Sequence, residues 1–189
     1  MLYHVSPQSD LKILQPHVST HGTAYVYAIE DMVTGMLFGV KQDDFDFLIS
    51  NDENTGIPII CECYPDAFQT VYQGQSCSVY QVAEEGFQRG KTSWEAELVC
   101  EKEVSVIKET VIDDLYERLL EEERMGHLMI CRYEFRDEYR KKISSHIVDR
   151  LIRFEIDLDK CMEQDKRFAL YYKDIIRELQ NIMDGHLLQ

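Results

Sequence analysis

The sequence predicts an α+β protein, with short strands in its first two thirds and amphipathic helices in its last third. Aromatic and β-branched residues form short runs bounded by turn residues, as at 24–29 (AYVYAI), and such runs are typical of strands. After residue 138, apolar residues recur every three or four positions, which is typical of helices that bury one face. The chain has 189 residues, 44% of them hydrophobic, which is enough for one core and a small appendage.

The expected strands follow one another from the N-terminus. They span 2–5, 24–29, 58–63, 78–83, 96–100, 103–107 and 128–133. Asp31 is placed to cap a short helix that runs to Phe38, because its carboxylate can accept a hydrogen bond from the first turn. Acidic and aromatic residues alternate at 43–47 (DDFDF), which indicates a half-exposed strand, and an acidic recognition loop remains the alternative. The cluster NDENTG at 51–56 predicts a turn.

Three helices are expected in the second half of the chain. They cover 111–124, about 138–156 and 166–183, and Gly185 follows the last as a stop signal. The apolar stripes of the last two suit an antiparallel helical hairpin packed on the sheet, or equally a homodimer interface. These two stripes consist of Ile143, Ile147, Leu151 and Phe154 in one helix, and Phe168, Tyr171, Ile175, Leu179 and Ile182 in the other. We therefore expect a first domain over 1–125, and a strand plus helical extension over 126–189.

The charge balance limits the class of partner. Asp and Glu total 35 against 20 Lys and Arg, which gives a formal charge of −15. Such a surface repels phosphate backbones and anionic lipids, so neither bulk nucleic-acid binding nor a membrane partner is expected. The most basic stretch, 132–142, also contains acidic residues and is interpreted as a solvated helix start. No apolar run reaches the roughly 18 residues of a membrane span, and no basic and apolar leader is visible, which favours the cytoplasm.

Two short motifs have less specific interpretations. Cys61 and Cys63 form a C-x-C pair whose side chains share one face of a strand and can in principle hold a metal. Without a second Cys or His pair at zinc-like spacing, we favour two small buried residues, no metal and no disulfide framework. The segment 86–92 reads G-x-x-x-G-K-T, which is one residue shorter than a P-loop and precedes no apolar helix. A nucleotide-hydrolysing P-loop is therefore not expected.

Three further segments resemble a known family when they are taken in order. They are Leu2-Tyr3-His4-Val5-Ser6, Val26-Tyr27-Ala28-Ile29 and Glu97-Leu98-Val99. They resemble the strands that frame the NAD cleft in the His–Tyr–Glu class of ADP-ribosyltransferases, which includes diphtheria-type toxins and poly-ADP-ribose polymerases. The resemblance covers about residues 1–110. It implies a split β-sheet domain that takes NAD as substrate, cleaves its nicotinamide–ribose bond, and transfers ADP-ribose to an unidentified acceptor or to water.

The resemblance also implies roles for individual side chains. Cleavage of the nicotinamide–ribose bond builds positive charge on the sugar, as in glycoside hydrolysis, and a fixed carboxylate stabilises that charge. Glu97 takes this role by its match to the family, and Glu95 on the same strand face is the fallback. The His4 imidazole would bind a ribose hydroxyl, and the Tyr27 ring would stack on nicotinamide.

The remaining cofactor contacts follow from the same comparison. Val5 and Ser6 complete the cofactor-binding strand after His4, and Phe38 would close the other side of the nicotinamide ring. The polar loop at 86–94 occupies the place that often contacts the acceptor in this family.

Two departures from the family pattern keep a second hypothesis open. The family has Gly where this chain has Val5, and no Arg precedes Arg89, so that Lys12 and Lys41 are the nearby cations for a diphosphate. His4, Tyr27 and Glu97 also have ordinary structural interpretations, as a satisfied histidine, a core tyrosine and a solvent-facing carboxylate. The alternative is a catalytically inactive member that works as a binding or regulatory module.

Overall fold

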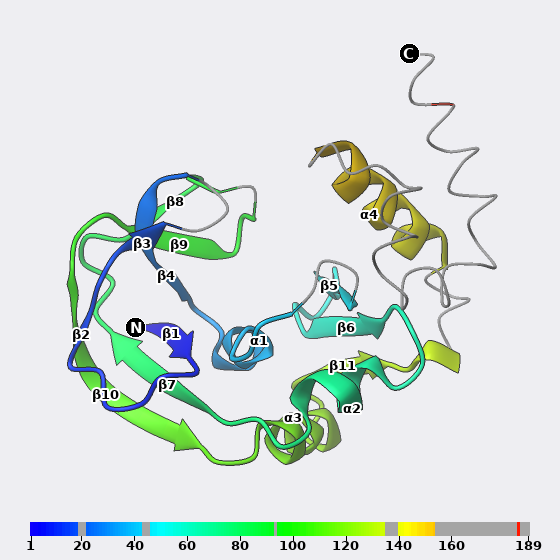
Figure 1. Ribbon diagram of the computed structural model, residues 1–189, viewed down its shortest axis with the longest axis horizontal. Coiled ribbons are helices and arrows are strands. Elements are labelled where there is room, and N and C mark those ends of the chain that lie inside the picture. Colours follow the sequence, from blue (N-terminus) through cyan, green and yellow to red (C-terminus); the bar gives the residue numbers. More distant parts are fainter. Residues whose placement is uncertain (19–21, 43–45, 93, 135–139, 154–184, 186–189) are drawn as a thin grey trace. The chain divides into compact units, whose positions relative to one another are not determined.

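The computed structural model describes residues 1–18, 22–42, 46–92, 94–134, 140–153 and 185 (Figure 1). It contains both strands and helices, which confirms the α+β class. The chain forms two compact units, the first from Met1–Lys41 and Tyr72–His127, the second from Gln42–Val71 and Leu128–Gln189. The expected division between 125 and 126 lies near the second junction. The two divisions differ at 42–71. The sequence interpretation assigns this segment to the first domain, whereas the structure groups it with the C-terminal part.

The first unit is built on one curved antiparallel sheet (Figure 1). Its strand order is β2-β10-β7-β1-β4-β9-β8, and β3 pairs with β4. The strands are β1 (Leu2–Ser6), β2 (Ile13–Leu14), β3 (His17–Val18), β4 (Ala24–Ile29), β7 (Cys77–Val82), β8 (Gln88–Arg89), β9 (Glu97–Cys100) and β10 (Val104–Ile112). Two helices, α1 (Met32–Leu37) and α3 (Leu115–Arg124), complete this unit.

The two faces of this sheet are covered differently. Both faces are buried, since buried positions follow one another along β4, β7 and β9. Successive strand residues point to opposite faces, and the face that holds the following hydrophobic core is called the inner face. This core consists of Leu2, Leu14, Val26, Ala28, Tyr80, Val82, Leu98, Cys100 and Val104. On the outer face lies α1, where an added Cβ at Gly35 would be 3.1 Å from Cγ2 of both Val5 and Ile29. The expected cap is confirmed, since the Asp31 carboxylate accepts a hydrogen bond from the Thr34 N–H.

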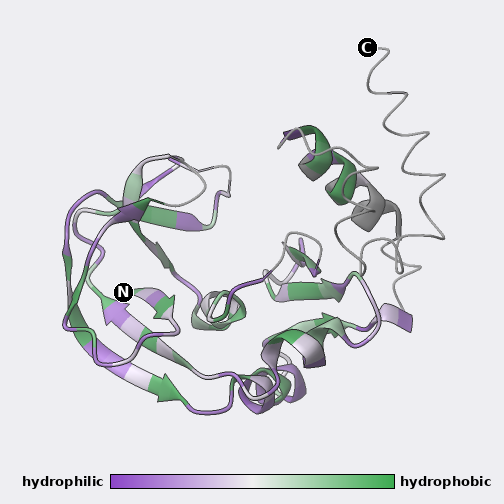
Figure 2. Ribbon diagram, in the orientation of Figure 1, coloured by the Kyte–Doolittle hydropathy of each residue, from purple (hydrophilic) through white to green (hydrophobic). Residues whose placement is uncertain are grey.

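The second unit contains a small three-stranded sheet in the order β11-β6-β5. Its elements are β5 (Phe47–Asn51), β6 (Pro58–Glu62), β11 (Met129–Cys131), α4 (Arg140–Arg153) and α2 (Ala67–Tyr72), whose last residue falls in the first unit. Figure 2 shows β6 as mostly hydrophobic, and all its residues are buried. The buried Glu62 is satisfied by two backbone donors, the N–H groups of Phe68 and Tyr133, each at 2.8 Å.

Several expected elements are confirmed, and others are corrected. The strand at 24–29 and the turn after residue 51 are found as predicted. The helix expected from residue 111 begins at Leu115, because β10 continues to Ile112 in its pairing with β7. At 43–47 the structure describes a turn at Asp46 and the start of β5 at Phe47.

Other expectations fall partly or wholly outside the described residues. The first C-terminal helix is present as α4, with Ile147 and Leu151 buried as its stripe predicts. The second, at 166–183, and with it the hairpin, lie outside the described residues. Among the helices that are described, none is long and apolar enough to span a membrane.

The close approach of Gly39 to β7 gives a test of this packing. A Cβ at Gly39 would lie 2.8 Å from Cys77 Sγ and 3.0 Å from Cys77 Cβ. We expect Gly39→Ala to lower the free energy of unfolding by about 1–3 kcal/mol through overpacking, as measured by urea denaturation. Cys77→Ala removes the sulfur, so the double variant should lose less than the two single variants add up to. Strict additivity would contradict the contact.

Candidate functional site

The three segments of the candidate site lie on three adjacent strands. In the sheet order β7-β1-β4-β9, His4 lies on β1, Tyr27 on β4 and Glu97 on β9. Tyr3 pairs with Ile29, and Ile29 pairs on its other side with Glu97. Residues that are far apart in the sequence are therefore brought to within two strand spacings, each about 4.8 Å.

Backbone pairing between β1 and β4 is short beside His4. Along the described residues, β1 pairs with β4 only at Tyr3 and Ile29, whereas it pairs with β7 along its whole length from Leu2 to Ser6. Beyond this single pair no backbone pairing between the two strands is described. Next to this pair, His4 Nδ1 lies 2.8 Å from the backbone carbonyl oxygen of Tyr27. A side chain thus joins the two strands at a point where backbone pairing between them has ended.

This contact defines the protonation state of His4. A carbonyl oxygen only accepts hydrogen bonds, so Nδ1 carries the hydrogen and donates it to Tyr27. Burial lowers the pKa of His4 below its ordinary value of 6.5; the bond to Tyr27 opposes this shift and the nearby His17 adds to it. The ring is therefore neutral at pH 7, with the lone pair on Nε2 as its acceptor.

Tyr27 and Glu97 share the outer face of the sheet. Tyr27 lies opposite Val99 on β9, so Glu97, two residues before Val99, is its diagonal neighbour on that face, a separation of roughly 7–8 Å between backbones. The Tyr27 ring has further aromatic neighbours: its centroid lies 6.0 Å from that of Tyr25 and 5.9 Å from that of His17. Both candidate side chains are half-buried.

His4 belongs by strand alternation to the opposite face. Its register partner is Tyr80, whose ring centroid lies 6.2 Å away on the core side of the sheet. The structure therefore brings His4 to the main chain of Tyr27, and the two side chains leave their strands on different faces. The His4 ring spans from β1 to the main chain of β4 through its Nδ1 contact with the Tyr27 carbonyl oxygen.

The structure also describes the other residues that were expected to contact the cofactor or replace Glu97. Val5 packs toward α1 beside Gly35, and the Ser6 hydroxyl accepts a hydrogen bond from the Gln8 N–H at 3.1 Å. Phe38 is the C-cap of α1 and stacks obliquely against Trp94, with 5.1 Å between ring centroids. Glu95 is exposed and precedes β9.

The nearby cations are mostly engaged with carboxylates. Arg89 forms an ion pair with Glu30, and this contact raises the pKa of Arg89. Lys12 pairs with Asp10 at 3.5 Å, with both side chains largely exposed. Lys41 is exposed at the end of the first segment of this unit. A diphosphate bound here would have to compete with Glu30 for Arg89.

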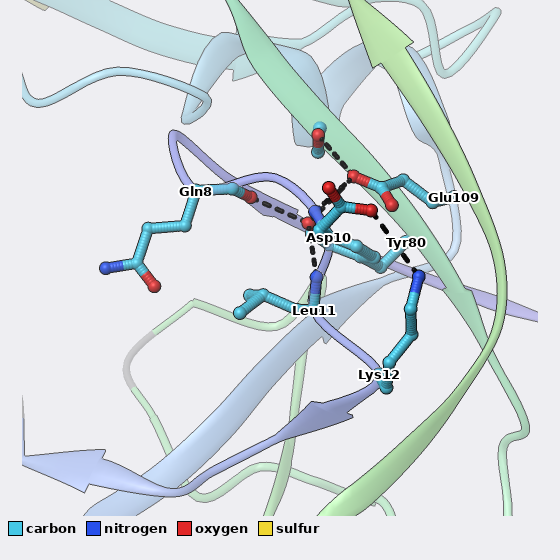
Figure 3. A network of polar contacts seen from close by, with 7 residues as sticks. Gln8, Asp10, Leu11, Lys12, Tyr80 and Glu109 are labelled. Carbon is cyan, nitrogen blue, oxygen red and sulfur yellow. Dashed lines mark hydrogen bonds and ion pairs between the residues drawn. The ribbon is translucent and has the colours of Figure 1, made fainter.

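A polar network around Tyr80, the register partner of His4, was not predicted from the sequence (Figure 3). Glu109 Oε1 accepts hydrogen bonds from the Asp10 N–H at 2.9 Å and the Ser78 hydroxyl at 2.8 Å, and the Tyr80 hydroxyl lies 3.0 Å away. The Tyr80 hydroxyl also bonds the Gln8 carbonyl at 2.7 Å. This network ties the chain after β1 onto β7 and β10. The alternation of Ser78, Tyr80 and Val82 was a sequence signal for a shared face, but nothing local pointed to Glu109.

Within the part of the chain that the structure describes, no three His, Cys, Asp or Glu side chains are placed to hold a metal ion. Cys61 and Cys63 are buried free thiols of the second unit, and Cys63 Sγ lies 4.0 Å from the Cys61 carbonyl oxygen. Their environment is that of small apolar core residues.

No protein-family model, curated protein or solved structure gave a match to this chain.

The Glu109 network makes a pH-dependent prediction. Hydrogen bonds, first from the Asp10 N–H and then from Ser78, lower the pKa of Glu109 below its ordinary value of 4.5. The stability that the carboxylate contributes is therefore complete above pH 4.5, and it is lost as the pH falls through the lower pKa of the folded state. Glu109→Gln should lower the urea midpoint at pH 7 more than at pH 3. Exposed Glu101→Gln is the matched control, and an equal loss at both pH values would contradict the assignment.

Proposed function

We propose that the first unit is an ADP-ribosyltransferase-like split-sheet domain that binds NAD and cleaves its nicotinamide–ribose bond. The observation that carries this proposal is the adjacency of β1, β4 and β9, together with the His4 contact that joins β1 to β4. Three short segments spread over about a hundred residues need not have formed neighbouring strands. The same segments on separate parts of the fold would have removed the basis of the resemblance.

The chemistry assigns one role to each of the three side chains. Heterolysis of the glycosidic bond leaves the electron pair on the nicotinamide nitrogen and positive charge on the ribose, which the Glu97 carboxylate stabilises. The Tyr27 ring provides an aromatic face on the same side of the sheet as Glu97. His4 leaves its strand on the other face of the sheet, so it acts as a positioning residue: its Nδ1–H bond to the Tyr27 carbonyl holds β1 beside β4.

A second candidate function is a non-catalytic binding module. The engaged state of Arg89, with Glu30 as its partner, favours this alternative, because an anionic dinucleotide needs an available cation. The packing of Val5 toward α1 favours it as well, since a β-branched side chain there fills space beside Gly35. The module would use the acidic surface or the C-terminal helices, which are also the proposed contact of a homodimer.

Nicotinamide release from NAD, followed by chromatography, tests the catalytic proposal. Glu97→Gln keeps the shape and hydrogen-bonding capacity of the side chain but removes its charge, so we expect the rate to fall at least about 100-fold. Binding of NAD, measured by calorimetry, should change by less than about threefold. Glu101→Gln, exposed beyond the other end of β9, is the control and should retain the wild-type rate.

Two results would redirect this assignment. If Glu95→Gln abolishes release and Glu97→Gln does not, the charge-stabilising role belongs to Glu95. If wild-type protein binds NAD without releasing nicotinamide, the binding module is the correct function. An absence of both release and binding at millimolar NAD contradicts the proposed site.

A further inference from the structure

Two cysteines of the second unit lie opposite each other on neighbouring strands. β11 and β6 are parallel, and Cys131 is the register partner of Cys61. Register partners of a parallel pair point to the same face of the sheet, with about 4.8 Å between their Cα atoms. A disulfide bond requires about 4.4–6.8 Å between these atoms. The spacing of the strands therefore suits a bond between these two cysteines.

A contact beside the two cysteines fixes their register. The buried Glu62, which follows Cys61, accepts a hydrogen bond at 2.8 Å from the N–H of Tyr133, two residues after Cys131. A slip of β11 by one residue would remove this donor from a buried carboxyl group and would turn Cys131 to the other face of the sheet. The pairing of the two cysteines is thus specified by more than the short strand itself.

The position of Cys131 on an edge strand gives it the access and freedom that the bond needs. Within the described residues, β11 is an outer strand of the order β11-β6-β5 and has three residues. The Cβ atoms of register partners are separated by about the strand spacing, slightly more than the roughly 3.5–4.5 Å of a disulfide, so β11 must move toward β6 by about a few tenths of an ångström. Cys131 is 6% exposed and Cys61 is 0% exposed, so an oxidant reaches Cys131 first.

A bond at this position would join two segments that are far apart in the sequence. The second unit consists of Gln42–Val71, which contains Cys61, and Leu128–Gln189, which contains Cys131. The intervening chain belongs to the first unit. Because a cross-link that closes a long loop restricts the unfolded chain, it stabilises the folded state more than a link across a short loop does.

We propose that Cys61 and Cys131 are an oxidation site, which forms a reversible disulfide with a peroxide as oxidant and fastens the two segments of the second unit. The deprotonated Cys131 sulfur attacks one oxygen of hydrogen peroxide, which gives a sulfenic acid and a first water. The Cys61 thiol loses its proton and attacks the Cys131 sulfur, and the hydroxyl departs as a second water. The two thiols lose two electrons and two protons, and the peroxide becomes two waters. A dithiol reverses the bond by exchange. This site is independent of the function proposed for the first unit.

Oxidation of the folded protein followed by peptide mapping tests this site. Hydrogen peroxide is added, the remaining thiols are alkylated, and linked peptides are identified by mass spectrometry without reduction. We expect a loss of two hydrogens per chain and a linked peptide pair containing Cys61 and Cys131, both reversed by dithiothreitol. Cys77 and Cys100 should remain thiols, because β1 and β4 separate their strands. The absence of a disulfide, or a different dominant pair such as one with Cys161, which lies outside the described residues, would overturn the proposal.

Serine variants distinguish the pair from a neighbouring thiol. Cys61→Ser and Cys131→Ser should each abolish the link. Cys63→Ser is the matched control, because Cys63 is also buried but is diagonal to Cys131, at roughly 8 Å between Cα atoms from the strand spacing and rise, and this variant should keep the link. A link that persists in Cys61→Ser and is lost in Cys63→Ser would overturn the proposal. Urea denaturation of each variant verifies that it is folded.

The fastening role has its own measurement. The oxidised wild type should unfold at a higher urea concentration than the reduced protein, whereas peroxide should not raise the midpoint of Cys131→Ser. An unchanged or lower midpoint of the oxidised wild type would overturn this role. Oxidation in urea that unfolds the chain removes the register, so the preference for Cys61 and Cys131 should disappear there. The same preference in the unfolded chain would show that the register is not its cause and would overturn the inference.

Discussion

The candidate site depends on the hydrogen bond from His4 Nδ1 to the carbonyl oxygen of Tyr27. Backbone carbonyls inside a sheet need donors, and beyond Tyr3 and Ile29 no backbone pairing between β1 and β4 is described. The imidazole supplies the donor and holds the two strands at a defined separation. The same contact places the hydrogen on Nδ1, and burial keeps the ring neutral. This contact positions the Tyr27 main chain beside β1.

The two faces of the sheet divide the remaining tasks. The inner face holds the hydrophobic core and the network in which Glu109 and Tyr80 secure the chain after β1. The outer face carries α1, the candidate side chains Tyr27 and Glu97, and the contact of Phe38 with Trp94 at the end of the helix. His4 leaves β1 on the inner face, and its ring nitrogen bonds the main chain of Tyr27, whose side chain lies on the outer face.

Elements with a strong local signal were predictable from the sequence. The run AYVYAI gave the bounds of β4, and Asp31 marked the start of α1, because propensity and capping are local properties. The two-residue strands β2, β3 and β8 contain too few residues to show a period. The last two residues of β10, Val111 and Ile112, were assigned to a helix because they fit either pattern. Neither the partners of Glu109 nor the contact of Phe38 with Trp94 could be predicted, because each joins residues whose proximity arises only from the sheet.

The protonation state of His4 is the most direct measurement of this account. Proton–nitrogen NMR correlation spectra of protein labelled with nitrogen-15 at histidine distinguish the two neutral tautomers and follow their titration. We expect a neutral His4 with its hydrogen on Nδ1 at pH 7, and a pKa below 6.5. A hydrogen on Nε2, or a pKa at or above 6.5, would contradict the bond between the strands and with it the proposed site.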